Sequence, residues 1–448
     1  MATADKPNAR PPGAAGREWT PHIWQGIDFL AWMRLLARNR FAVHPSCIHV
    51  AVIVTVISVL HTLLRLVENV VYGSRVRRTP LKESPLFIIG HWRTGTTLLH
   101  ELLILDQRHT YPTTYECLEP NHFLLTEGAL TRLLWFLMPK RRPMDNMAAG
   151  WDRPQEDEFA LCMMGQPSPY TTIAFPNHPP QGQDAFDLEN LSAPAQTSWK
   201  QALVRFLRRL TFKNPAKRLI LKSPPHTWRI KTLLELFPDA RFVHIVRDPY
   251  VVFPSTVNLW MSLYHAHGLQ NPTGEGLEEY VLNTFTRMYT KLEETRSLIR
   301  PSRFFEMRYE DLVRDPVGQM RSLYDQLKLS GFEEVLPRIE QYLTQVAGYQ
   351  TNRYELPADK RELVTRRWGE VIRQYGYARE AKPVVKPVES DPTPVNGVSH
   401  ISVAEPRPAF PSSSVPQPIS FPRDRSAAAE LRSTDVQPGY RNGTKPRS

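Results

Sequence analysis

Apolar and polar positions change their spacing repeatedly between residues 80 and 377 of this 448-residue chain. Short apolar runs, which are typical of buried strands, alternate with longer amphipathic stretches, which are typical of helices. The predicted strands lie near residues 85–89, 218–222, 241–246 and 303–308. The predicted helices lie near residues 96–105, 226–237, 249–262 and 316–328. This alternation predicts an α/β fold with a parallel β-sheet flanked by helices.

The alternation is interrupted by a long insertion at residues 120–215. Its pattern is largely helix and loop, and it carries Trp151, Tyr170 and repeated prolines. Insertions at strand ends usually shape binding pockets, so we expect this segment to form one. The two ends of the chain, residues 1–18 and 378–448, are rich in proline and polar residues, and both are predicted to be disordered.

Residues 19–78 precede the predicted domain and contain an amphipathic helix followed by a strongly apolar one. From Phe41 to Leu64 there is no Asp, Glu, Lys or Arg, and this stretch is long enough to cross a bilayer. Arginines flank it on both sides, at positions 34, 38, 40, 65, 75, 77 and 78. The stretch also contains histidines and a proline. We therefore favour helices packed on the main domain, or lying on a membrane surface, over a true span.

The turn after the first predicted strand has the composition of an anion-binding loop. The strand ends at Gly90, and a helix opens after Gly95. Such a turn aims backbone N–H groups and the positive end of the helix dipole at one point. Arg93 adds a permanent positive charge. Hydroxyl groups come from Thr94, Thr96 and Thr97. The spacing nearly fits the Walker A pattern of a P-loop, but Thr96 stands in place of its lysine, which argues against phosphoryl transfer.

A second strand also ends in charge, at Arg247 and Asp248. Pro249 suits the first turn of a following helix. Ser255 comes eight residues after Arg247, about two helical turns further, so its hydroxyl can return to the same side as the strand end. The two strand ends together predict a site for the phosphate-type groups of a nucleotide.

These segments resemble the 5′-phosphosulfate loop and the 3′-phosphate site of sulfotransferases that use 3′-phosphoadenosine 5′-phosphosulfate (PAPS). The likeness is to the bacterial and Golgi-type branch, whose loop reads Arg-Ser/Thr-Gly-Thr-Thr and which includes the tyrosylprotein sulfotransferases. It covers roughly residues 80–377 and implies a P-loop-like fold. The residues that would hold the 5′-phosphosulfate are Arg93, Thr94, Gly95, Thr96 and Thr97. Arg247 and Ser255 would hold the 3′-phosphate, and Tyr309 would contact the cofactor.

The resemblance also implies catalytic residues. Lys222 matches the lysine at a strand end of the family and, with Arg93, would stabilise charge on the transferring sulfuryl group. Glu116 aligns with the catalytic glutamate of the tyrosylprotein enzymes and is the first candidate for the base that takes the acceptor proton. His226 is its rival. Each of these two could instead be a helix-start or capping residue. The acidic run 155–158 is a third candidate set, which we interpret as an orienting shell.

The net charge and the cysteine content indicate which partners the protein binds and in which cellular compartment it works. The net charge of +11 suits anionic cofactors and anionic lipid headgroups, and no nucleic-acid-binding motif stands out. Three cysteines, Cys47, Cys117 and Cys162, do not make a disulfide framework, which favours the cytoplasm, with membrane association through residues 19–78. No cluster of His, Cys and carboxylates has metal-ligand spacing, so no metal is predicted.

The sequence thus predicts a PAPS-dependent sulfotransferase that moves a sulfuryl group to a hydroxyl or amine by in-line displacement. The acceptor stays open among small molecules, glycans, lipids and peptides. One alternative is a kinase-like P-loop phosphotransferase, which would need ATP and magnesium. The other is a non-catalytic, membrane-tethered nucleotide-binding protein. Such a protein would not need Arg93, Lys222, Arg247 and Ser255 together, and their joint presence argues against it.

Overall fold

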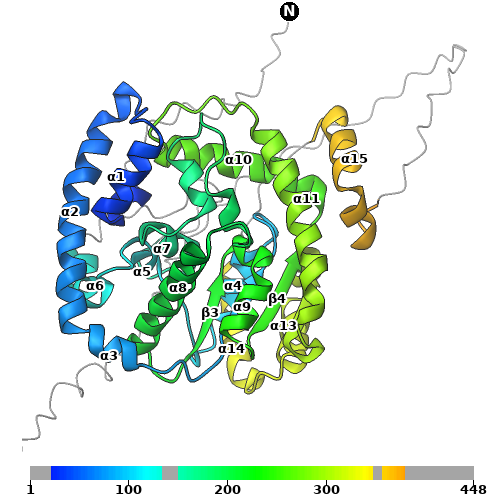
Figure 1. The fold of residues 1–448 in the computed structure, drawn as a ribbon. Helices are drawn as coiled ribbons and strands as arrows, with labels where there is room; N and C mark the ends of the chain where they lie inside the picture. The colour runs from blue at the N-terminus through cyan, green and yellow to red at the C-terminus, as the bar shows by residue number, and fades with distance from the viewer. Residues whose placement is uncertain (1–21, 134–149, 347–355, 379–448) are drawn as a thin grey trace, which may run out of the picture. The chain divides into compact units, whose positions relative to one another are not determined.

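The structure is a computed structural model that describes residues 22–133, 150–346 and 356–378 (Figure 1). The disorder predicted for residues 1–18 falls outside the described residues, as does that predicted for the tail beyond residue 378. The described residues up to Tyr377 belong to one compact unit.

A five-stranded parallel sheet forms the centre of this unit, in the order β2-β3-β1-β4-β5. Its strands are β1 (Leu86–Ile89), β2 (His109–Thr110), β3 (Arg218–Lys222), β4 (Arg241–Val246) and β5 (Phe304–Arg308). The first strand in the chain lies between β3 and β4, so the strand order reverses there. The carboxyl ends of β1, β3 and β4 meet at this reversal, which is where open α/β sheets bind ligands.

Helices cover both faces of the sheet, as the continuous apolar strands require. On one face, Phe87 and Ile89 of β1 join a large core with α8 (Ala193–Lys213), α9 (Ile230–Leu236), α10 (Pro249–His267), α11 (Leu277–Thr295) and α15 (Ala358–Gln374) (Figure 1). On the other face, Leu86 and Ile88 join a second core with α4 (Thr96–Leu103), α12 (Tyr309–Arg314), α13 (Pro316–Gln326) and α14 (Phe332–Val346). The predicted α/β fold with a parallel sheet flanked by helices is confirmed.

The remaining helices belong to the N-terminal segment and to the insertion. They are α1 (Phe29–Arg38), α2 (Ile48–Val71), α3 (Gly73–Arg78), α5 (Thr114–Leu118), α6 (Phe123–Leu133) and α7 (Asp157–Met163). Helix α5 directly precedes the insertion. In the described part of the insertion, α6, α7 and α8 alternate with loops and short turns, as the sequence predicted. Short 3₁₀ turns join several of the helices.

The predicted strands match the observed ones to within one residue. Strand β2 was not predicted, because two residues are too short to show a pattern. The helix predicted at 226–237 begins later, at Ile230. Two consecutive prolines, which lack N–H groups, open a 3₁₀ turn over Pro224–Trp228 instead. Helix α10 continues past its predicted end at residue 262 to His267.

Helix α2 is shifted towards the C-terminus relative to the apolar stretch that predicted it. Pro45 opens a 3₁₀ turn, so the helix starts at Ile48. It continues to Val71, past Glu68, whose carboxylate lies 3.3 Å from Arg209 Nε of α8. One side of α2 also packs against α1, where Trp32 Nε1 donates to Thr55 Oγ1 over 2.8 Å. Among the described residues, one helical stretch, Pro45–Val71, is long and apolar enough to cross a membrane. This judgement rests on length and composition alone.

Candidate active site

The loop between β1 and α4 adopts a backbone that glycine makes possible. Gly90 and Gly95 both have positive φ angles, of 141° and 98°. A Cβ at Gly90 would lie 2.6 Å from the carbonyl oxygen of Ile245 in β4, and a Cβ at Gly95 would collide with the Tyr309 ring. Arg93 also has a positive φ, of 68°, which is uncommon for a residue with a side chain. Such backbone strain concentrates at functional sites.

Hydrogen bonds inside the loop hold its shape. The Thr94 hydroxyl donates to the His91 carbonyl over 2.7 Å. Burial lowers the pKa of His91 to about 3, so this ring is neutral and the positive charge of the loop comes from Arg93. Thr96 and Thr97 form the first turn of α4, where an anion meets the free N–H groups of the helix.

The loop and the end of β4 are joined by direct hydrogen bonds. Arg93 Nε donates to Ser255 Oγ over 2.9 Å, and Arg247 Nη1 donates to the Arg93 carbonyl over 3.1 Å. Asp248 caps α10 through the N–H of Tyr250, and Pro249 is the first residue of the helix. The return of Ser255 to the strand end, which was predicted from spacing, is thus observed.

Arg247 is a mostly buried cation that makes no ion pair with any described residue. Its guanidinium lies 4.2 Å from the centre of the Tyr309 ring, which also packs against Gly95. Burial lowers the pKa of Arg247 below its usual value, and the nearby charge of Arg93 lowers it further. A buried cation beside another cation is stabilised when an anion binds between them. The residues predicted to hold a nucleotide with two phosphate-type groups are therefore brought together here.

Lys222, at the carboxyl end of β3, is buried and paired with a carboxylate that the sequence analysis ranked third. Its Nζ lies 2.7 Å from Glu156 Oε1. The other oxygen of Glu156 accepts a hydrogen bond from the Tyr170 hydroxyl, which in turn accepts from Trp92 Nε1 over 3.1 Å. Burial raises the pKa of Tyr170 well above its usual value, and the charge of Glu156 raises it further, so the phenol stays protonated and donates.

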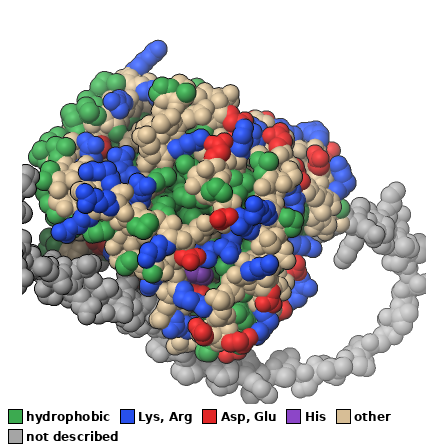
Figure 2. All heavy atoms as spheres, turned by 60° about the horizontal axis from the view of Figure 1, so that its bottom comes forward, with side chains coloured by type: hydrophobic (Ala, Val, Ile, Leu, Met, Phe, Trp, Pro, Cys, Tyr) green, Lys and Arg blue, Asp and Glu red, His purple; other side chains and the backbone are tan. Residues whose placement is uncertain are grey.

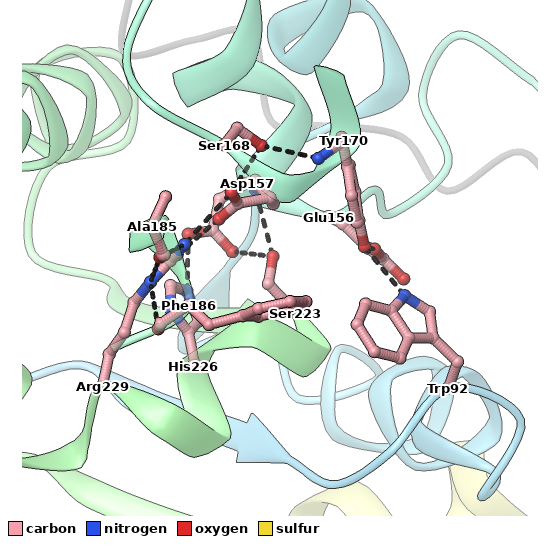
Figure 3. Close-up of polar contacts among 11 residues, drawn as sticks. Trp92, Glu156, Asp157, Ser168, Tyr170, Ala185, Phe186, Ser223, His226 and Arg229 are labelled. Atoms are coloured by element: carbon pink, nitrogen blue, oxygen red, sulfur yellow. Dashed lines mark hydrogen bonds and ion pairs between the residues drawn. The ribbon is translucent and has the colours of Figure 1, made fainter. Parts of the chain in front are cut away.

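His226 belongs to a buried polar network with Asp157 and Ser223 (Figure 3). Its Nε2 donates to Asp157 Oδ2 over 2.7 Å, and Ser223 Oγ donates to Asp157 Oδ1 over 2.8 Å. Burial alone would raise the pKa of Asp157, but its contacts with His226 and Ser223 lower it below the usual range. Both side chains of the Asp157–His226 pair are fully buried. Arg229 pairs with Glu158 in the same network. This arrangement holds the start of α7 against the end of β3.

Glu116 takes the capping role that the sequence analysis left open as the alternative. It forms a capping box with Thr113 at the start of α5, where Glu116 Oε2 accepts from the Thr113 N–H over 2.7 Å. Its other oxygen lies 2.8 Å from Lys213 Nζ, at the end of α8. The side chain is fully buried. The carboxylate that contacts Lys222 is therefore that of Glu156, and the sequence signal for it was only its place in an acidic run.

Comparison with known proteins agrees with this geometry. The profile of the sulfotransferase family matches residues 85–334. The omega-hydroxy-beta-dihydromenaquinone-9 sulfotransferases Stf3 of Mycobacterium bovis and Mycobacterium tuberculosis are each 53% identical to this chain over 363 residues, which are 81% of this chain and 93% of each relative. The crystal structure of sulfotransferase STF9 from Mycobacterium avium shares the fold, with a TM-score of 0.58 and 23% identity over 78% of this chain and 92% of that one.

The chain therefore belongs to the sulfotransferase family, as the resemblance of its two motifs implied. It is an enzyme, a transferase that moves a sulfuryl group. This family membership argues against both alternatives, the kinase-like phosphotransferase and the non-catalytic nucleotide-binding protein.

Proposed function

We propose that this enzyme takes the sulfuryl group from PAPS and transfers it to the hydroxyl of a lipid-like acceptor at a membrane surface. The observation that carries the donor assignment is the hydrogen-bonded chain from Arg247 through Arg93 to Ser255. It joins the loop after β1 to the helix after β4. Two separate anion-binding elements in contact fit a nucleotide with a phosphate-type group at each end of its ribose.

The donor supplies the sulfuryl group and a phosphate leaving group, and the chain supplies fixed charge. Arg93 lies in the loop after β1 and Lys222 at the end of β3, and we propose that both supply positive charge to the transferring sulfuryl group. Such groups lower the barrier because they need no reorganisation during the reaction. We propose that Glu156 is the base that takes the acceptor proton, because it contacts Lys222 directly and is not fully enclosed.

The first prediction concerns the 3′-phosphate site. Arg247→Gln should weaken the binding of 3′,5′-bisphosphoadenosine about 10- to 100-fold, since a charge-assisted hydrogen bond contributes about 1.5–3 kcal/mol. The binding of AMP, which lacks the 3′-phosphate, should change little. Isothermal calorimetry with both nucleotides measures this difference.

The matched control for this experiment is Arg241→Gln. Arg241 lies at the opposite end of β4, and its Nε donates to the Leu327 carbonyl. Its replacement should leave the ratio of the two affinities unchanged. Equal affinity of the unaltered protein for 3′,5′-bisphosphoadenosine and AMP would show that Arg247 does not bind a 3′-phosphate.

Two observations support a lipid-like acceptor. The mycobacterial relatives are named for a hydroxylated menaquinone derivative, which is a lipid. In this chain, aromatic rings surround Trp92 of the loop, beside the proposed base. Their ring centres lie 5.6–6.4 Å from that of Trp92, and they belong to Tyr170, Phe186, Trp228 and Trp260. These rings are buried in the core, so the surroundings of the proposed base are mainly apolar, which favours an acceptor with an apolar body.

The outer side of α2 supports the membrane part of the proposal. Its large apolar residues are 45–85% exposed, and they include Ile48, Val52, Ile53, Val56, Val59, Leu60, Leu63, Leu66, Val67, Val70 and Val71. On the left of the face in Figure 2, where α2 lies, hydrophobic side chains border a group of lysines and arginines. Exposed apolar surface flanked by positive charge fits the surface of an anionic bilayer. The opposite side of α2 makes polar contacts with α1, through Thr55, and with α8, through Glu68 and Arg209, so we infer that α2 lies in the interface rather than crossing it.

The second prediction follows from this placement of α2. The unaltered protein should cosediment with vesicles that contain phosphatidylglycerol, and less so as the salt concentration rises. Val56→Asp together with Leu60→Asp should abolish cosedimentation, because both side chains are exposed on α2. Val313→Asp is the control, since it adds charge at an exposed apolar site on α12. An unaltered protein that does not cosediment with the vesicles and instead dimerises through α2 would contradict the proposal.

A further inference from the structure

Three metal-ligating side chains from two distant segments converge beside α2. His61 lies in the middle of α2, Glu119 caps the end of α5, and His122 directly precedes α6. His61 Nδ1 lies 2.7 Å from Glu119 Oε2, His122 Nε2 lies 3.1 Å from the same oxygen, and the two ring nitrogens are 2.6 Å apart. All three side chains are shielded from solvent, with exposed fractions of 14% or less.

One hydrogen bond among the three side chains is well aligned, between His61 Nδ1 and His122 Nε2 over 2.6 Å. Glu119 Oε2 is enclosed and accepts no well-aligned hydrogen bond from any described residue, although both ring nitrogens are within 3.1 Å of it. The ligand oxygen of the Glu119 carboxylate lies within 4.8 Å of both ring nitrogens. Its negative charge and the ring nitrogens therefore face one small volume.

A contact with Thr126 determines which ring nitrogen of His122 carries the proton. It is Nδ1, the nitrogen that faces away from His61 and Glu119. The Thr126 hydroxyl donates to the His122 carbonyl over 2.9 Å, so its oxygen accepts from His122 Nδ1 over 3.0 Å. With the proton on Nδ1, the lone pair of Nε2 faces His61 and Glu119. Metal-bound histidines are oriented in the same way, by a hydrogen bond from the nitrogen that does not bind the metal.

We propose that His61, Glu119 and His122 bind one zinc ion. Two imidazole nitrogens and one carboxylate oxygen are a ligand set that zinc prefers, with a fourth position left for water. In a tetrahedral site with metal–ligand distances of about 2.0–2.1 Å, ligand atoms lie about 3.3–3.4 Å apart, so the three atoms would need to separate by up to about 0.8 Å. The ion would fasten α2, which carries the exposed apolar surface, to the insertion at α5 and α6. Figure 1 shows α6 beside α2.

The sequence gives no signal for this site beyond the pair Glu119 and His122. The third ligand, His61, comes 58 residues before Glu119, within a stretch that reads as apolar. The proposal therefore departs from the prediction of no metal, because only the fold brings the three ligands together. The site is separate from the carboxyl ends of the strands, so the charges proposed for sulfuryl transfer are untouched.

The test uses tag-free, full-length protein that has been stripped of metal with EDTA and returned to chelator-free buffer. Titration with Zn²⁺ against a chromophoric chelator should show about one tightly bound equivalent, and Zn²⁺ should raise the Tm. Co²⁺ in place of Zn²⁺ should give the intense visible absorption bands of a four-coordinate site.

Three variants locate the ion. His61→Gln and Glu119→Gln should each lose the tight equivalent and the Tm response to Zn²⁺. His49→Gln removes an exposed histidine from the same helix and should keep both. Tight Zn²⁺ binding that persists in both ligand variants, or no tight equivalent in the unaltered protein, would overturn the proposal. If the ligand variants do not fold, the Co²⁺ spectrum of the unaltered protein decides, because the lack of four-coordinate bands would also overturn it.

Discussion

Replacing Lys222 with methionine is expected to lower turnover about 10²–10³-fold, the effect of losing one preorganised charge at a transition state. Methionine keeps the length of the side chain in its buried position at the end of β3 but removes the ammonium. Binding of the product nucleotide 3′,5′-bisphosphoadenosine should change little, because it lacks the sulfuryl group. Turnover with saturating PAPS, measured beside the dissociation constant of this nucleotide, separates the two effects.

The loss of Lys222 also leaves the Glu156 carboxylate without its ion-pair partner, which should lower the Tm. The double variant Lys222→Met with Glu156→Gln should recover part of that stability without recovering turnover. Lys200→Met is the matched control, because Lys200 pairs with Glu235 at the surface. Near-normal turnover of Lys222→Met at an unchanged Tm would remove Lys222 from the catalytic site.

Glu156→Gln is expected to lower turnover about 10²–10⁴-fold, the usual contribution of a general base. Glutamine keeps the shape and can still accept from Tyr170, but it cannot take a proton. The loss should be smaller for a more acidic acceptor hydroxyl, because such a group needs less help to lose its proton. Turnover with two acceptors of different acidity therefore distinguishes a base from a residue that only positions Lys222.

Glu116→Gln and His226→Asn are the comparison variants. Glu116→Gln should lower the Tm, because it weakens the capping box at α5 and the contact with Lys213, while turnover stays within a few fold. His226→Asn should disturb the fully buried pair with Asp157 and act mainly on stability. Normal turnover of Glu156→Gln together with a large loss in either comparison variant at unchanged Tm would move the base to that residue.

The shape of the proposed donor-binding loop could be predicted from sequence because its determinants are local. A strand that ends at Gly90, a helix that starts at Thr96 and an intervening arginine specify a loop whose shape depends on neighbours in the chain. The same holds for Ser255, which α10 places about two turns beyond Arg247 at the end of β4. Adjacent parallel strands then bring both segments to one edge of the sheet.

The partner of Lys222 could not be predicted in this way because it depends on how the insertion folds back. Glu156 and Lys222 are 66 residues apart, and no periodic pattern links them. Glu116 was ranked above Glu156 by its alignment with a family motif, yet Thr-x-x-Glu before a helix is also the signature of a capping box. A motif of this kind is typical both of a catalytic base and of a helix cap, and only the tertiary structure shows whether the capping hydrogen bonds form.

The most direct test of the account offers the full-length protein PAPS that carries labelled sulfur, together with vesicles that contain an ω-hydroxylated dihydromenaquinone. We predict that the label moves to the lipid extract while an equal amount of 3′,5′-bisphosphoadenosine appears, and that ATP with magnesium supports no transfer to the same lipid. Folded protein that binds 3′,5′-bisphosphoadenosine but leaves the label on the nucleotide, with this lipid and with soluble hydroxyl acceptors alike, would contradict the account.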